Sequence, residues 1–250
     1  MGTRHSQTVI DKDGNLKLRQ YGQWDGYPEG QGLDILKFLL FGNLEKYQKN
    51  LDNVKNITDE QAKEIEKDPD WPRNHMYLSR DCGSRIHKMI EMNKAPLTSI
   101  IDKFDVQQEG IYKIDFQKRK FTSQFHDTKK IYSLDKLPTI EQYLKDMGVE
   151  QDRFDSALKY EKQFEKLKKI KTLEQCLKAV NKFMKDRRIE KSEIESIRLN
   201  TWSDDPRFNC SITFKAGGYD RASFDIPTIT LAKAVMDTLS KEMIKLKVKS

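Results

Sequence analysis

The chain has 250 residues, of which 36% are hydrophobic and 34% are charged. This length allows one large domain or two small ones, and no apolar run approaches the roughly 18 residues of a membrane span. Cys82, Cys176 and Cys210 are few and far apart, which argues against a disulfide framework or a zinc site. We therefore expect a cytoplasmic protein that carries no metal and no cofactor.

The net charge of +7 is unevenly distributed along the chain. Residues 1–150 hold 24 basic and 24 acidic side chains, whereas residues 151–250 hold 22 and 15. The basic excess therefore lies entirely in the second part. Any nucleic-acid-binding surface would belong there.

The first half predicts a hairpin, then helices, then a second hairpin. Residues 3–10 and 16–24 flank an Asp-Gly turn, as the two strands of a hairpin do. Apolar residues at helical spacing predict a helix from Leu33 that Gly42 and Asn43 interrupt. Residues 58–67 form a short helix with a capping box at its start.

A further helix is expected to begin at Ser79, with Arg80 and Asp81 in its first turn. Residues 110–115 and 120–125 then predict the second hairpin. The economical arrangement of these elements is a mostly antiparallel sheet with helices packed on it. We therefore predict an α+β fold for this half of the chain.

From Thr139 onwards the periodicity becomes helical. A short helix is expected from Thr139. Longer helices are expected over residues 152–170 and 172–188. Strands follow at 193–202, 208–214 and 221–226, and a helix at 228–247, which makes a small C-terminal βββα unit. The predicted organisation is an N-terminal α+β domain, a helical connector and this unit, over residues 1–133, 134–190 and 191–250.

The most informative stretch is the loop at residues 20–32, QYGQWDGYPEGQG. It holds four glycines and three aromatic residues but no aliphatic residue. Glycines allow close backbone approach, while Trp and Tyr give rigid contact area with a polar tip. We expect an ordered loop that presents polar groups.

The opening MGTRH and this loop resemble a family of phage and bacterial proteins of uncharacterised function. Members typically contain MGTRH, a short hairpin and then QYGQWDGYPxGQG. LSRDCG at residues 78–83 and YKID at residues 112–115 are similar to two further motifs of the family. The resemblance covers residues 1–125 and implies no activity. If a phage encodes the chain, it implies a location in the host cytoplasm.

The order of hairpin, helices and hairpin also resembles half of an N-terminal-nucleophile hydrolase. That resemblance implies Thr3 as the catalytic nucleophile, with its own amine as base. Removal of Met1 before Gly2 would leave Thr3 without a free amine, so the chemistry would require that Gly2 is also cleaved. Whether the protein is an enzyme stays open at this point.

The candidate ligand-binding residues gather around the loop. They are Arg4, His5, Gln20, Gln23, Trp24, Asp25, Tyr27, Gln31, Arg80 and Asp81. One interpretation is that hydrogen bonds among them hold the loop on the hairpin. The other is a polar pocket in which Arg4 or His5 meets an anion while Trp24 or Tyr27 stacks on a ring.

Other motifs have structural interpretations. The glycines after Gly26 follow a strand as in phosphate-binding loops, but Asp25, Glu29 and Asp34 would repel phosphate. Asp81 at a helix start is explained by the helix dipole. His75, His87 and His126 lack metal-ligand spacing.

The basic stretch at residues 166–188 is interleaved with carboxylates, as on a solvated helix face.

From the loop at residues 20–32 we expect an accessory binding protein whose loop engages a small polar ligand or a host protein. Such a protein would modulate host or defence functions. The alternatives are the amide-bond hydrolase and a nucleic-acid-binding protein acting through helices 160–190. We expect no membrane contact and do not expect nucleic acid as the partner.

Overall fold

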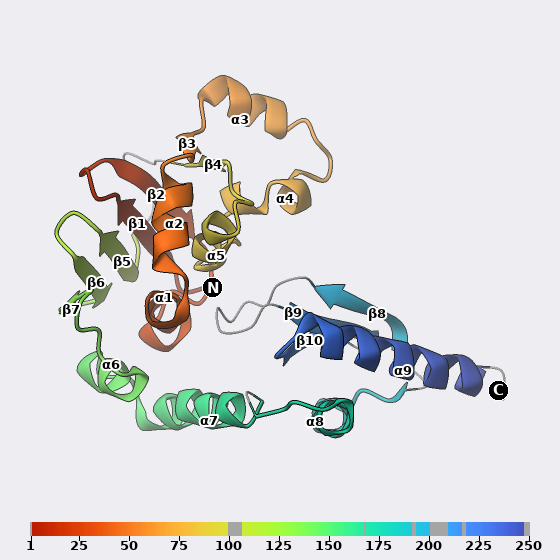
Figure 1. Ribbon diagram of the computed structural model, residues 1–250. Coiled ribbons are helices and arrows are strands. Elements are labelled where there is room, and N and C mark those ends of the chain that lie inside the picture. Colours follow the sequence, from red (N-terminus) through yellow and green to blue (C-terminus); the bar gives the residue numbers. More distant parts are fainter. Residues whose placement is uncertain are drawn as a thin grey trace. The chain divides into compact units, whose positions relative to one another are not determined.

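The computed structural model describes residues 2–99, 107–167, 169–191, 194–200, 210–216 and 219–247. The chain divides into two compact units, Met1–Ala157 and Leu158–Ser250, called unit 1 and unit 2 below. Helices and strands are combined in both units (Figure 1), so the predicted α+β class is confirmed.

Unit 1 is built on a five-stranded mixed sheet with the order β2-β1-β5-β6-β7. Strand β1 pairs antiparallel with β2 and parallel with β5, and the remaining neighbours are antiparallel. The strands are β1 (His5–Ile10), β2 (Leu16–Gly22), β5 (Gly110–Asp115), β6 (Lys120–Phe125) and β7 (Thr128–Ser133). A separate short parallel pair joins β3 (Lys55–Asn56) and β4 (Leu97–Thr98).

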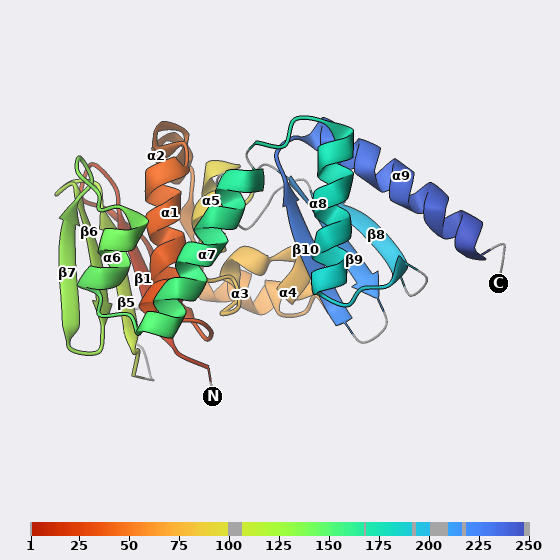
Figure 2. The ribbon, with the colours of Figure 1, turned by 90° about the horizontal axis from the view of Figure 1, so that it is seen from below.

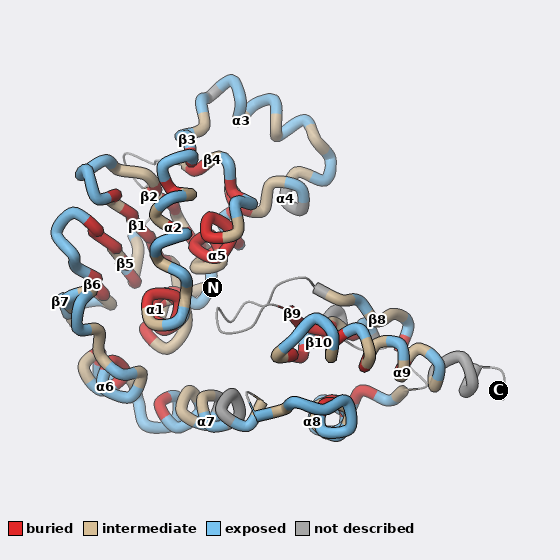
Figure 3. The backbone as a smooth tube through the Cα atoms, in the orientation of Figure 1, coloured by how far each residue is buried: buried red, intermediate tan, exposed pale blue. Residues whose placement is uncertain are grey.

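The helices of unit 1 lie on one side of this sheet, as the two ribbon views show (Figures 1 and 2). They are α1 (Leu33–Phe41), α2 (Leu44–Leu51), α3 (Asp59–Ile65), α4 (Trp71–Asn74), α5 (Arg85–Glu91) and α6 (Ile140–Asp146). Two helical turns, η1 (Pro28–Gly32) and η2 (Met76–Leu78), complete the set. The buried residues concentrate where α1 and α5 face the strands, while α3 is mostly exposed (Figure 3).

Alternation along the strands determines which side faces the helices. Val9, Leu18, Tyr112, Ile114 and Phe121 are buried, and each is separated from the next inward residue of its strand by one that points outward. Burial of such aliphatic and aromatic side chains is the main stabilising contribution, at about 1.5–3 kcal/mol for each side chain. The sheet therefore has one buried face under the helices, and this face is apolar at these five positions.

Several local predictions for unit 1 are confirmed. Both hairpins form, and the second has the predicted bounds. The long helix stops at Gly42, and the Asn43 side chain caps α2 by accepting from the Lys46 amide. Thr58 and Gln61 make the predicted capping box at α3.

One local prediction is wrong. The helix expected from Ser79 begins only at Arg85, so Arg80 and Asp81 lie in a turn. The Ser79 hydroxyl accepts from the Asp81 amide in that turn. Gly83 has a φ of +54°, in the left-handed region that ends or prevents a helix. The helix-dipole explanation for Asp81 therefore fails.

Unit 2 contains the second half of α7 (Gln151–Leu167) and a three-stranded antiparallel sheet of order β10-β9-β8. The strands are β8 (Ile194–Asn200), β9 (Cys210–Ala216) and β10 (Tyr219–Ile226). Helices α8 (Leu173–Asp186) and α9 (Ile229–Lys247) pack against this sheet. The predicted βββα unit is thus present, and Phe208, at the start of the predicted central strand, lies outside the described residues.

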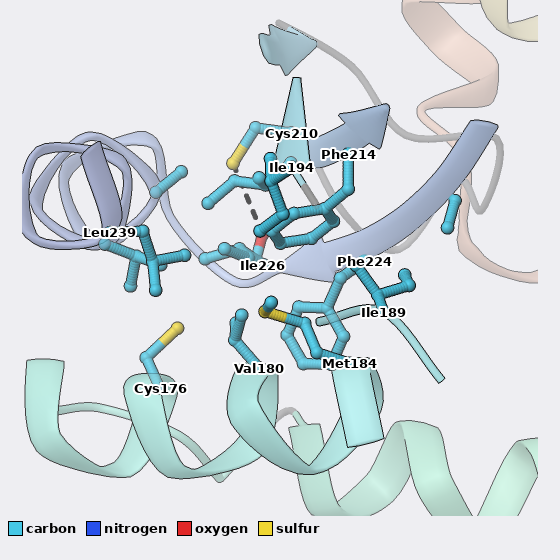
Figure 4. Packing of buried hydrophobic residues seen from close by; sticks show 14 residues of the cluster. Cys176, Val180, Met184, Ile189, Ile194, Cys210, Phe214, Phe224, Ile226 and Leu239 are labelled. Atoms are coloured by element: carbon cyan, nitrogen blue, oxygen red, sulfur yellow. Dashed lines mark hydrogen bonds between the residues drawn. The ribbon is translucent and has the colours of Figure 1, made fainter. Parts of the chain in front are cut away.

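The core of unit 2 is a single apolar cluster (Figure 4). Cys176, Val180 and Met184 recur at helical spacing on α8 and face Phe224 and Ile226 of β10. From β9, Cys210, Ile212 and Phe214 are fully buried, as the strict alternation of that strand predicts. Both helices therefore share one face of the small sheet.

The helices predicted as a connector are α6, α7 and α8. Helix α6 packs against α1 in unit 1, where Tyr143 is buried beside Phe121. Helix α8 packs against β10 and α9 in unit 2. The predicted boundaries after residues 133 and 190 stay predictions.

Candidate functional site

The loop at residues 20–32 is held by its backbone at several points. The Gly26 amide donates to the Thr3 carbonyl at 2.9 Å, and the Gly26 carbonyl accepts from the Tyr112 hydroxyl at 2.9 Å. The Gln31 amide donates to the Asp25 carbonyl at 2.9 Å and closes the loop on itself. The loop is therefore held by the segment before β1, by strand β5 and by its own backbone.

Amide side chains join the loop and its hairpin to the segment 77–84. Gln20, which is buried, donates from Nε2 to the Tyr77 carbonyl at 3.0 Å. Gln7 donates to the Gly83 carbonyl at 2.7 Å. Gln31 accepts from the Ser84 amide at 2.6 Å. Buried amides that bond to backbone carbonyls fix the position of the chain they reach.

Trp24 is the exposed point of this assembly. Its indole Nε1 donates to the Asp81 carboxylate at 2.8 Å, and its side chain is still 51% exposed. One edge of the ring lies so close to Gly2 that a Cβ at that position would collide with it. The indole is therefore held in one orientation while half of its surface faces solvent.

Next to Trp24, Asp25 adopts a φ of +55°, a conformation that Asp tolerates better than most residues. Its carboxylate accepts from the Tyr27 hydroxyl at 2.9 Å. Burial and the Asp25 carboxylate raise the pKa of Tyr27 above its ordinary value, so the hydroxyl stays protonated and donates. This bond keeps the Asp25 carboxylate on the outer side of the loop.

A cavity of about 470 Å³ lies beside the loop. Its lining comes from the loop and from α7: Tyr27, Glu29, Asp152, Arg153, Ser156 and Ala157. Arg153 donates to Glu29 at 2.9 Å and lies 5.5 Å from the Tyr27 ring centroid, a cation–π contact. The Glu29 carboxylate in turn raises the pKa of Arg153. Glu29 and Arg153, two of the charged groups of this cavity, are therefore already paired with each other.

Under the loop lies His5, which is fully buried. Burial lowers the pKa of His5 to about 4, although the Asp25 carboxylate and the Trp24 backbone act in the opposite direction. The imidazole packs directly on Gly22, where any Cβ would overlap the ring. His5 is therefore a neutral structural side chain at physiological pH.

The structure brings most of the predicted site residues together. Trp24 is bonded to Asp81, and the adjacent Asp25 is bonded to the half-buried Tyr27. His5, Gln20 and Gln31 hold the surrounding backbone in place. The Gln23 side chain accepts from the Tyr21 hydroxyl, and the Gln23 backbone amide donates to the Arg80 carbonyl at 3.1 Å. Arg4 contributes its backbone: its N–H donates to the Glu109 carboxylate, and its carbonyl accepts from the Gly110 N–H.

Sequence reasoning did not select Gln7, Tyr112, Glu29 or Arg153 as part of this site. Gln7, Tyr112 and Glu29 lie in or near the motifs named above, so the sequence could have indicated them. Arg153 is 124 residues from Glu29 and follows no motif. Only the folded chain reveals that pair.

No protein-family model, curated protein or solved structure matches the chain. In the described ranges, no group of three or more His, Cys, Asp or Glu side chains is placed to hold a metal ion. None of the described helices is long and apolar enough to cross a membrane. The resemblance to a phage and bacterial family and the nucleophile role of Thr3 both stay predictions.

Proposed function

We propose that the protein is an accessory binding protein whose loop at residues 20–32 engages a partner protein. The observation that carries the proposal is the half-exposed indole of Trp24, fixed on one edge by Asp81. Trp is strongly enriched among the residues that dominate binding energy at protein interfaces. A preformed side chain also loses little conformational entropy on binding.

The charge around Trp24 indicates what the partner presents. Asp25, the next residue in the sequence, and Asp81, which accepts from the indole, are both exposed. A lysine or arginine of the partner would find two carboxylates and an exposed aromatic ring on this part of the surface. We therefore propose a partner surface with a basic side chain at its centre.

A small polar ligand in the neighbouring cavity is the second candidate. The cavity of about 470 Å³ has the size of a ligand site. Its Glu29 and Arg153 side chains, however, already form an ion pair with each other. A ligand there would have to replace that pair, whereas a protein at Trp24 replaces only water. The geometry therefore favours the protein partner.

The resemblance of the loop to proteins of phages and bacteria supports a partner in the host cell. The test is affinity capture from a bacterial lysate with the wild-type protein, Trp24→Ala and Phe41→Ala as baits. Phe41 is the matched control because it is an aromatic residue with a similar exposed fraction, 47% against 51% for Trp24. Proteins and small molecules released from each bait are identified by mass spectrometry.

We expect one or a few proteins to be retained by the wild type and Phe41→Ala and to be lost with Trp24→Ala. Capture of the same proteins by all three baits would show that the loop is not the interface. A small molecule that is retained until Arg153→Ala is introduced would instead support the second candidate.

A further inference from the structure

A second cavity lies wholly within unit 2 and has no part in the proposed loop interface. It has a volume of about 630 Å³ and lies among the end of α7, one side of α8 and strand β10. Ligand sites for small molecules typically have volumes of about 300–1,000 Å³. The cavity is therefore large enough for a compact organic ligand.

The rim of this cavity is cationic. Lys159, Lys162 and Lys166 lie at positions i, i+3 and i+7 of α7, so they share one face of that helix. Lys182 lies on α8, and Arg187 is the residue directly after its end. All five side chains are exposed at their ends. Two helices thus present rows of cations to the same space.

The floor of the cavity is apolar and aromatic. Phe183 and Phe224 meet edge to face, with ring centroids 5.2 Å apart. Leu167 and Ala179 widen this surface. Arg187 lies 5.6 Å from the Phe183 ring centroid, so a planar cation already stacks near the aromatic floor. In the core view, Phe224 lies beside Met184, which supports it from behind (Figure 4).

We propose that this cavity binds a nucleoside di- or triphosphate. The heterocyclic base would lie against Phe183, with the Arg187 guanidinium moved outward onto the other face of the base, since base–aromatic stacking and cation–π contact favour flat rings. The phosphates would lie between the lysines of α7 and Lys182 of α8, where they would be neutralised. Aromatic floor and cationic rim thus correspond to the two ends of one ligand.

The charge balance selects this ligand among other anions. Five cations and two carboxylates, Asp186 and Asp225, line the cavity, which gives a formal charge of 5 − 2 = +3. A fatty acid carries one negative charge and would use only one of the five cations. A long nucleic acid would have to pass both carboxylates, which would repel its phosphates. A short, multiply charged anion with an aromatic ring fits the whole set.

Isothermal titration calorimetry of the full-length protein tests the proposal. The probes are ATP, GTP, CTP and UTP, together with adenosine and inorganic triphosphate as the two halves of ATP. We expect at least one nucleotide to bind with a micromolar Kd. Adenosine and triphosphate should each bind at least tenfold more weakly, because each occupies only the floor or only the rim.

Lys182→Glu should weaken nucleotide binding at least tenfold. The matched control is Lys178→Glu, which makes the same charge change one turn earlier on α8, outside the cavity lining. This control should stay within twofold of the wild type. Phe183→Leu should weaken the nucleotide about tenfold while leaving inorganic triphosphate unchanged. Both lysines are exposed, so circular dichroism should show an intact fold for both variants.

Three results would overturn the proposal. One is the absence of binding for all four nucleotides at about 1 mM. Another is an equal loss for Lys178→Glu and Lys182→Glu, which would show attraction by general positive charge. The third is binding of a ten-residue oligothymidylate without binding of any free nucleotide, which would make the cavity part of a strand-binding groove.

Discussion

The two units of this chain bury different kinds of side chain. In unit 1, the sheet and helices enclose polar and charged groups such as His5, Gln7, Gln20 and the Lys88–Glu91 pair. In unit 2, Ser211 is the one buried polar side chain among the described residues, and the rest of the core is apolar. Buried polar groups cost free energy unless they are bonded.

This difference shows how each unit builds its candidate site. Unit 1 uses its interior amides to hold an external loop, so the position of Trp24 depends on buried hydrogen bonds. Unit 2 has an ordinary hydrophobic core and places its charged groups around a cavity at the edge. The loop of unit 1 should therefore be sensitive to interior substitutions that leave the cavity of unit 2 unaffected.

The largest effect is expected from breaking the buried ion pair of unit 1. Lys88 Nζ lies 3.1 Å from Glu91 Oε1, and both side chains are only 9% exposed. Lys88→Met should reduce the free energy of unfolding by about 3–5 kcal/mol, because Glu91 would stay buried without a countercharge. The double variant Lys88→Met/Glu91→Leu should recover most of that loss. Urea denaturation measures both.

The matched control for this prediction is Lys67→Met, which breaks the exposed Lys67–Glu64 pair. That variant should unfold like the wild type. Hydrogen exchange should place the effect of Lys88→Met in unit 1 peptides. Equal loss of protection in unit 2 peptides would mean that the two units unfold as one.

Acid should destabilise unit 1 before unit 2. All four histidines lie in unit 1, and burial lowers the pKa of His5 to about 4 and that of His87 to about 3, from 6.5. Below 6.5 the unfolded chain binds protons that the folded chain does not bind, so stability falls as the pH falls towards 4. Together the two histidines should lower the free energy of unfolding by about 3 kcal/mol when the pH is reduced from about 7.5 to about 5.5.

Hydrogen exchange of unit 1 and unit 2 peptides at the two pH values measures this effect. His87→Phe should remove about half of the pH dependence of unit 1. His126→Gln should leave it unchanged because His126 is exposed. A pH dependence of the same size in unit 2, which has no histidine, would contradict the assignment.

An intermediate effect is expected from Gln20→Leu. The substitution leaves the Tyr77 carbonyl without its donor in a buried position, which costs about 1–3 kcal/mol. It also loosens the segment that carries Asp81, so acrylamide quenching of Trp24 fluorescence, measured with Trp71 and Trp202 replaced by Phe, should increase. Gln117→Leu, at an exposed turn position, is the control. Unchanged quenching in Gln20→Leu would show that the interior amides do not position the loop.

The smallest effect on stability is expected at the loop surface. Trp24→Ala should reduce the free energy of unfolding by less than about 2 kcal/mol while partner capture is lost. Trp24→Phe keeps an aromatic ring but removes the donor to Asp81, so it should retain part of the binding. Unfolding of Trp24→Ala at room temperature would make the loop a structural element instead.

Much of the fold was predictable because its signals are local. The second hairpin has alternating apolar residues on both sides of a polar turn, and Asn43, Thr58 and Thr172 cap their helices with their own side chains. The sequence analysis assigned no strand to β7, because TKKIYS is polar and lies at the edge of the sheet. An edge strand exposed on one side needs few apolar residues.

The site was predictable as a loop but not as a set of contacts. The composition of residues 20–32 identified the segment and most of its exposed side chains. It gave no indication that Asp81, expected in a helix, would instead accept from Trp24 across 57 residues. It also gave no indication that Phe183 would lie in a cavity with the lysines. Both depend on distant segments that determine where a side chain points.

The parallel pairing of β1 with β5 has a consequence for how the chain folds. His5 pairs with Gly110, so this contact joins positions 105 residues apart, whereas β1–β2 and β5–β6–β7 are local hairpins. Contacts between distant residues form late because a long loop must first close. Tyr112, which fixes the Gly26 carbonyl, arrives with that late strand. On a ribosome, the loop would therefore acquire its final shape only after more than 110 residues had been synthesised.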